Sequence, residues 1–137
     1  MRSLKLRLSV FILVIVFALI YGCSSINRDG YYKDGYLVVT INQSFEKVYN
    51  KSLDLIKSGQ LRDYTGHEYN IDVNKKMVDE AEIIAKSSVD SSDFIAIIFT
   101  KRSKDQTKVA VKHNKNGDTI GSSAFISMLQ SDNLNKS

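Results

Sequence analysis

The sequence predicts an α+β fold, an antiparallel sheet of about four to five strands with two helices on one face. Two observations lead to it. From residue 36 onward, short β-branched or alternating runs recur between turn-forming residues, which is typical of strands. Two other segments space their apolar residues as a helix does, and the resulting order is β-α-β-β-β-β-α. Strands gathered between two helices pack as two layers, so we expect the helices on one face of the sheet.

The first strand and the first helix are predicted from adjacent segments. Residues 36–41 (YLVVTI) are β-branched and aliphatic, which favours a strand. Ser44 has the chemistry of a helix N-cap, and Gly59 stands where it can end the helix. Between them, one side of the predicted helix consists of Phe45, Val48, Tyr49, Ser52, Leu55 and Ile56.

Four more strands are predicted after an irregular stretch at residues 60–68. Residues 69–74 and 107–113 alternate apolar and polar side chains, as half-exposed strands do. Residues 94–100 (FIAIIFT) form a continuous apolar run that suits the centre of the sheet. Residues 81–87 fit a strand or a helix by propensity, and we interpret them as a strand because their neighbours are strands.

A closing helix is predicted at residues 119–131. Asn116, Gly117 and Asp118 supply a turn and then a cap directly before it. We expect this helix to bury one side, formed by Ile120, Ala124, Phe125, Met128 and Leu129.

The apolar run within residues 94–100 also bears on binding. Successive residues of a strand face opposite sides of the sheet, so the run offers two apolar rows. Helices on one face can bury only one row, and large exposed apolar surfaces are uncommon on monomers. We expect the second row to be covered by the chain itself or by a partner, with Ile97 and Phe99 as candidate contact residues.

The N-terminus carries the features of a secretory signal peptide. The first nine residues include three cations, and the ten residues 10–19 are all apolar. A helix that spans a bilayer needs about 20 apolar residues, so this run is too short to span one comfortably. A basic start followed by a short apolar run is typical of a signal peptide.

The residues after this run resemble the lipobox of bacterial lipoproteins. In residues 20–23 (IYGC), an aliphatic residue stands three positions before the only cysteine and a small residue directly before it, whereas Tyr21 departs from the pattern. The resemblance implies that Cys23 is lipidated and that residues 1–22 are removed. Ser24, in place of an aspartate, implies the periplasmic face of the outer membrane.

Processing at Cys23 would divide the chain and limit its chemistry. Residues 23–35 become a lipidated cysteine and its tether, residues 36–131 a single domain, and residues 132–137 a polar tail. Removing the three N-terminal cations lowers the formal charge from +4 to 4 − 3 = +1, which excludes a strongly basic, nucleic-acid-binding protein. Lipidation also uses the only thiol. The alternative is an uncleaved signal anchor with Cys23 unmodified.

The hairpin of the last two predicted strands is rich in cations. Its candidate contact residues are Lys101, Arg102, Lys104, Lys108 and Lys112. Next to a membrane, each exposed cation adds about 1 kcal/mol of attraction to anionic lipid. These residues are candidate contacts for acidic lipid headgroups or for an acidic envelope partner. We favour the other interpretation, in which the lysines protect a sheet edge from pairing with other strands.

No segment predicts catalysis, a metal site or a cofactor. His67 and Glu68, with Asp63 and Asp72 nearby, are interpreted as a solvated loop, since structural zinc sites use Cys and His at tight spacings. His113 ends a strand beside a turn and is expected to be exposed. The serines show no nucleophile-elbow pattern, and neighbouring carboxylates show no sign of burial. We therefore expect a protein that is not an enzyme.

Four segments carry a family resemblance: residues 36–41 (YLVVTI), 44–49 (SFEKVY), 107–111 (TKVAV) and 117–118 (GD). In this order they resemble a family of small bacterial lipoproteins built on one domain of unknown function. The resemblance covers roughly residues 36–131 and implies the same order of strands and helices. It implies no activity and no functional residues.

Together these observations predict a membrane-anchored, non-enzymatic lipoprotein of the bacterial cell envelope. It is expected to bind or support another envelope component. The expected partners are the membrane, through Cys23, and an envelope protein or a second copy of the chain, but not nucleic acid. The alternative is a small protein that binds a lipid or another apolar ligand, because residues 44–49 also resemble the start of helix-grip lipid-binding domains.

Overall fold

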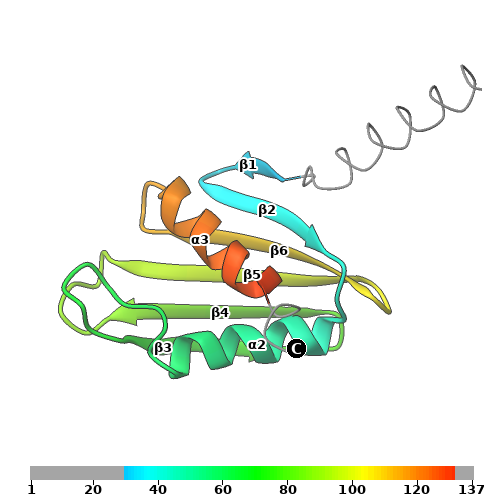
Figure 1. Ribbon diagram of the computed structural model, residues 1–137, viewed down its shortest axis with the longest axis horizontal. Helices are drawn as coiled ribbons and strands as arrows, with labels where there is room; N and C mark the ends of the chain where they lie inside the picture. The colour runs from blue at the N-terminus through cyan, green and yellow to red at the C-terminus, as the bar shows by residue number, and fades with distance from the viewer. Residues whose placement is uncertain (1–29, 132–137) are drawn as a thin grey trace, which may run out of the picture.

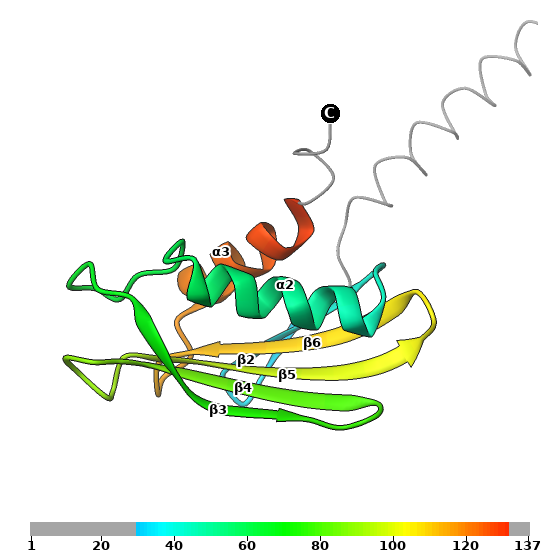
Figure 2. The same cartoon turned by 90° about the horizontal axis from the view of Figure 1, so that it is seen from below.

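Six strands form one antiparallel sheet, and two helices lie side by side on one of its faces (Figures 1 and 2). The computed structural model describes residues 30–131. The elements in chain order are β1 (Tyr31–Lys33), β2 (Tyr36–Ile41), α2 (Phe45–Lys57), β3 (Tyr69–Lys76), β4 (Glu80–Ser87), β5 (Phe94–Ser103), β6 (Gln106–His113) and α3 (Thr119–Gln130).

The sheet order is β1-β2-β6-β5-β4-β3. Strands β3 to β6 follow one another as hairpins, and β6 then pairs with β2, with Leu37 opposite Val111 and Ile41 opposite Thr107. Helix α2 carries the chain across the sheet from β2 to the far edge at β3. The α+β class with two helices on one face is confirmed, and the sheet has more strands than the four to five expected.

Helix α2 forms where the spacing of its residues predicts it. The Ser44 hydroxyl oxygen accepts a hydrogen bond from the Lys47 backbone N–H at 3.3 Å, which satisfies one free donor of the first turn. Gly59 follows the C-cap residue Ser58 with a φ of +74°, a value that other residues rarely adopt. The buried side consists of the predicted residues Phe45, Val48, Tyr49, Ser52, Leu55 and Ile56.

Strand β1 lies in the segment expected to be part of the tether. Tyr31 pairs with Val38 of β2, so β1 adds an edge strand to the sheet. In the connecting turn, Asp34 has a φ of +54° and Gly35 a φ of +84°, the two positive values that a two-residue hairpin turn requires. This corrects the tether expected at residues 23–35, because its last part belongs to the sheet.

The helices cover the row of β5 that contains Ile97 and Phe99. Both residues are 0 % exposed and pack in the core between the sheet and the helices. The other row contains Ala96 and Ile98, and Ile98 is 36 % exposed. The expectation that Ile97 and Phe99 contact a partner is therefore corrected: folding buries them, and the row on the helix-free face is the other one.

Helix α3 begins and is capped as predicted, and it buries part of the expected side. Asp118 Oδ1 accepts a hydrogen bond from the Ile120 backbone N–H at 3.0 Å. Ile120 is 80 % exposed, and Ala124 is exposed as well, although both were expected in the core. The buried residues are Ser122, Phe125, Ile126 and Leu129. Phe125 and Leu129 are thus buried as expected, whereas Ser122 and Ile126 are buried in place of Ile120 and Ala124.

Candidate functional site

The helix-free face of the sheet, called the outer face from here on, is crossed by two rows of neighbouring side chains. One row runs through Tyr36, Lys112, Ala96, Ile84 and Val73. The next row runs through Val38, Ala110, Ile98, Glu82 and Lys75. Most residues of the two rows are apolar, whereas Lys112, Glu82 and Lys75 are charged, so the outer face is a mixed surface.

The predicted basic residues divide between the hairpin tip and the outer face. Lys108 and Lys112 are half-buried on β6 and face outward. The Lys112 ammonium lies 5.6 Å from the centre of the Tyr36 ring, within the range of a cation–π contact. Because β6 lies between β2 and β5, these two lysines do not protect a sheet edge. The residues at the tip are Lys101, Arg102 and Lys104, and all three are exposed.

A network of polar side chains, called the end cluster, lies where β3 begins and β6 ends. The Tyr69 hydroxyl donates a hydrogen bond to Asp93 Oδ1 at 2.6 Å and lies 3.1 Å from His113 Nε2. His113 Nδ1 lies 3.4 Å from Oδ2 of Asp118, the N-cap residue of α3. The end cluster therefore connects β3, β6, the start of β5 and the start of α3.

His113 is largely enclosed, which corrects the expectation that it is exposed. Its side chain is 18 % exposed, and its ring packs against Gly121 of α3. A Cβ atom at Gly121 would lie 2.8 Å from His113 Cγ and Nδ1. The sequence signal at His113 was that of a strand end. Nothing in that signal indicates that Tyr69, 44 residues away, and Gly121 of the following helix lie against the ring.

Asp63 organises the loop before β3 from a buried position. Its carboxylate accepts hydrogen bonds from the hydroxyls of Ser87 and Thr65 and from the His67 backbone N–H. Burial raises the pKa of Asp63, but these hydrogen bonds together outweigh it and hold the pKa well below its usual value. Asp63 thus departs from the solvated loop expected here. Asp72 lies elsewhere, paired with Lys86 at 3.2 Å.

The chemistry of the end cluster is that of a structural connection. Burial, and then the hydrogen bond to Asp93, raise the pKa of the Tyr69 hydroxyl, so this group stays protonated and donates. Asp93 Oδ2 also accepts from the Tyr64 backbone N–H at 3.1 Å. Both carboxylate oxygens of Asp93 therefore bind donors of the same chain, and they hold two loops against the sheet.

The surface pockets formed by residues 30–131 include one beside the end cluster and one between the helices. One, of about 330 Å³, lies beside the end cluster and is lined by Tyr64, Asp90, Ser92, Asp93, Asn114, Lys115 and Asn116. The hydrogen bond from the Ser92 hydroxyl is the largest of the effects that lower the pKa of Asp90 in this lining. This pocket is polar and shallow, and Asp90 and Asp93 already bind donors of the chain.

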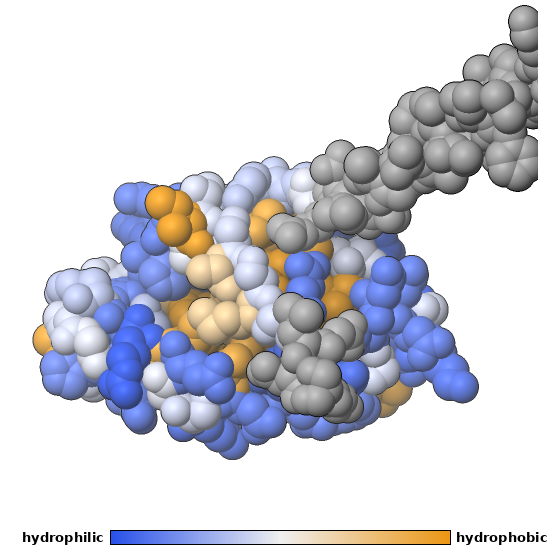
Figure 3. Space-filling view, in the orientation of Figure 1, coloured by the Kyte–Doolittle hydropathy of each residue, from blue (hydrophilic) through white to orange (hydrophobic). Residues whose placement is uncertain are grey.

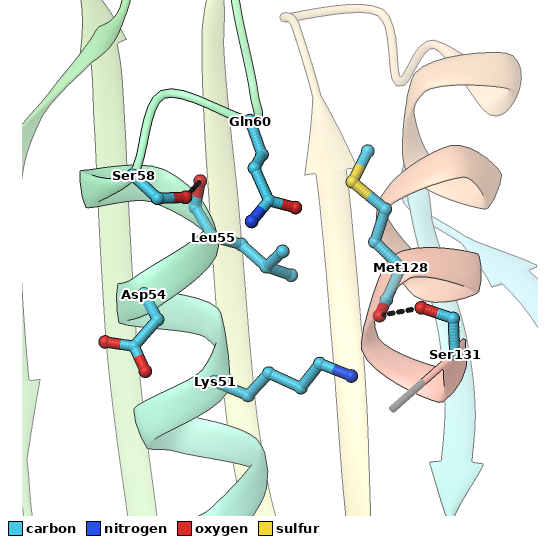
Figure 4. A pocket seen from close by; sticks show the side chains of 7 residues that line it. All are labelled: Lys51, Asp54, Leu55, Ser58, Gln60, Met128 and Ser131. Atoms are coloured by element: carbon cyan, nitrogen blue, oxygen red, sulfur yellow. Dashed lines mark hydrogen bonds between the residues drawn. The ribbon is translucent and has the colours of Figure 1, made fainter. Parts of the chain in front are cut away.

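The second pocket, of about 270 Å³, lies between α2 and α3 (Figure 4). The Lys51 side chain reaches from α2 towards α3 and donates a hydrogen bond to the Leu129 carbonyl oxygen at 3.1 Å. Leu55 and Met128 are the apolar residues of its lining. Figure 3 shows apolar surface between the helices with hydrophilic surface around it. The polar lining residues are Lys51, Asp54, Ser58, Gln60 and Ser131, so the walls of the pocket are partly apolar and partly polar.

Three further findings limit the chemistry within residues 30–131. In this part of the chain, no group of three or more His, Cys, Asp or Glu side chains is arranged to hold a metal ion. No helix of the same part is long and apolar enough to cross a membrane. Cys23, the predicted lipidation site, lies outside the described residues.

Comparison with known proteins identifies the family but no activity. No curated protein matches the chain. The model of a family described as "protein of unknown function (DUF3568)" matches residues 5–132, nearly the whole chain. The chain therefore belongs to this family of proteins with a domain of unknown function.

Proposed function

We propose that the protein is a lipoprotein of the bacterial cell envelope whose domain binds another envelope component and is not an enzyme. The observation that carries the proposal is the position of Cys23, directly after a basic start and a short apolar run. The family match covers residues 5–132, a range that contains both the apolar run and Cys23. An anchor of two or more acyl chains holds a protein stably on a membrane.

The sheet supports a role close to the membrane. Because β1 begins at Tyr31, only residues 24–30 separate Cys23 from the sheet. At full extension these residues span about 25 Å. A domain held this closely stays beside the lipid surface, where its own surfaces meet lipids and neighbouring envelope proteins.

The described side chains favour binding over catalysis. In the end cluster, Tyr69 and the Tyr64 backbone N–H donate to Asp93, and these bonds connect loops to the sheet. The outer face, in contrast, presents exposed charged side chains and the partly exposed Ile98, and within residues 30–131 no helix covers it (Figure 2). Open surface of this kind is suited to a partner.

The anchor is tested by replacing the cysteine. In cells fed radiolabelled palmitate, the Cys23→Ser variant should lose the label and leave the membrane fraction or remain unprocessed. A Ser25→Ala variant serves as the control, because it leaves residues 20–24 unchanged and should be labelled normally. Continued labelling of Cys23→Ser would contradict the proposal.

The proposed destination is the periplasmic face of the outer membrane, and it has its own test. An aspartate directly after the lipidated cysteine acts in many Gram-negative bacteria as a signal for retention in the inner membrane. The Ser24→Asp variant should therefore move from the outer to the inner membrane fraction while keeping its palmitate label. Unchanged fractionation of a labelled Ser24→Asp protein would contradict this destination.

A further inference from the structure

We propose that one half of the outer face, formed by β1, β2 and β6, lies against anionic lipid. We call this half the anchor-side face, because β1 is the first element after the N-terminal segment. The proposal deepens the proposed function and requires that the N-terminal segment holds the chain at a membrane. Its outward-facing residues are Tyr31, Lys33, Tyr36, Val38, Thr40, Lys108, Ala110 and Lys112.

Charge is distributed unevenly across the outer face. The strand positions of the anchor-side face include three lysines and no acidic residue, and the nearest acid of these strands, Asp34, lies in the β1–β2 turn. The far half, on β4 and β3, contains the acidic residues Glu80, Glu82 and Asp72. Asp72 there is paired with Lys86 at 3.2 Å. Only the anchor-side half thus presents unmixed positive charge, which complements anionic headgroups.

Aromatic residues lie among these lysines. Tyr31 is 49 % exposed and points to the outer side, as its pairing with Val38 shows. Tyr36 lies beneath the Lys112 ammonium. Tyrosine rings are favoured at the level of lipid headgroups because they combine an apolar body with a polar hydroxyl. Tyr32 points to the helix layer instead, where its hydroxyl lies 3.4 Å from Ser123 Oγ.

The connection to the membrane makes lipid the fitting occupant of this face. Gly30 lies against Leu37 and Val39 of β2, so the chain from residue 23 joins the sheet at this half. A connection of residues 24–30 keeps β1 within about 25 Å of the anchor. Tyr31, Lys33 and Lys108 are therefore within reach of the lipid surface.

The experiment uses a single tryptophan as a depth reporter, since the natural chain contains none. Full-length Tyr31→Trp protein is purified from membranes and reconstituted into phosphatidylcholine vesicles with brominated phosphatidylglycerol. The matched reporter is Ile120→Trp, at an exposed position on α3 in the other layer. We expect strong quenching of the tryptophan at position 31 and weak quenching at position 120. Equal quenching at both positions, or none at position 31, would overturn the proposal.

Two pairs of substitutions test the charge. Each lysine contributes roughly a fivefold preference for the anionic surface. Lys108→Gln with Lys112→Gln should therefore lower the preference roughly 25-fold and reduce quenching at position 31. Lys75→Gln with Lys86→Gln, on the far half, should leave it unchanged. Equal effects of both pairs would contradict a contact confined to the anchor-side face. Burial of the tryptophan at position 31 only in the presence of other envelope proteins would contradict it as well.

This test is independent of palmitate labelling. Reconstitution holds the full chain in the bilayer through a lipidated cysteine or through an uncleaved apolar segment. A protein without label whose reporter at position 31 is quenched would contradict the lipoprotein proposal and support the contact. A labelled protein without quenching would do the reverse.

Discussion

At the scale of single residues, the contact between His113 and Gly121 fixes the start of α3 on the sheet. The imidazole ring occupies the space that a side chain at Gly121 would need. His113 also lies between Tyr69 and Asp118, so moving its ring would disturb the end cluster and the cap of α3 together. A glycine in a helix normally weakens it, and here close packing explains why one is present.

The Gly121→Ala substitution should destabilise the protein. Alanine improves helix propensity by about 1 kcal/mol, but overpacking of a filled site costs about 1–3 kcal/mol. We expect a net loss, measured as the free energy of unfolding in urea. Ser127→Ala, at an exposed position of the same helix, should be neutral or slightly stabilising. If Gly121→Ala were as stable as Ser127→Ala, the enclosed position of His113 would be wrong.

The buried carboxylate of Asp63 predicts a dependence of stability on pH. Its pKa is lower in the folded protein than in the unfolded chain. Its contribution is therefore fully present above the usual aspartate pKa of about 4 and is lost as the pH falls below it. Asp63→Asn should be less stable than the natural protein at neutral pH, and the difference in free energy of unfolding should shrink in acid.

The control for this pH series is Asp105→Asn in the exposed β5–β6 turn. The free energy of unfolding of Asp105→Asn should stay close to that of the natural protein at every pH. A constant difference for Asp63→Asn down to acid pH would show that the carboxylate is not held by charged hydrogen bonds.

At the scale of elements, the two rows of β5 separate the core from the outer face. Ile97 lies in the core, and its neighbour Ile98 lies on the outer face between Ala110 and Glu82. The Ile97→Asp variant should fail to fold, because an unpaired charge would be buried. Ile98→Asp should fold with a modest loss of stability. Circular dichroism with thermal unfolding distinguishes them, and a folded Ile97→Asp protein would contradict the assignment of the rows.

Local signals in the sequence were sufficient for some elements and not for others. Helix α2 was predictable because the Ser44 cap, the helical spacing and Gly59 all agree. The sequence Asp34-Gly35 is typical of a hairpin turn. The strand before it was not predictable, because the three residues of β1 are too few for a strand pattern. In α3, the spacing of Ile120 and Ala124 fits the apolar side of a helix. Tertiary packing instead buries Ser122 and Ile126.

The surfaces were less predictable than the elements. The basic character of Lys108 and Lys112 was evident, but the pairing of β6 with β2 decides that they lie inside the sheet on its outer face. The row of β5 that lies in the core is the one that the helices cover. Alternation of side chains along the strand does not indicate which of the two rows this is. The end cluster joins residues more than 40 positions apart, such as Tyr69 and His113, so no local pattern indicates it.

At the scale of the whole molecule, the proposed membrane anchor and the basic half of the outer face are related by their positions. The N-terminal segment joins the sheet at β1, and the unmixed positive charge of the outer face lies on the same half. A domain anchored there would present its helices and the α2–α3 pocket away from the lipid. In this proposed orientation, the helix layer would be free to contact another envelope component.

The most direct test of the account is the intact mass of the natural protein purified from cell membranes. The account predicts a chain that begins at Cys23, lacks residues 1–22, and carries the added mass of a diacylglyceryl group and an amide-linked acyl chain. A chain that retains Met1, or one with an unmodified Cys23 thiol, would contradict it.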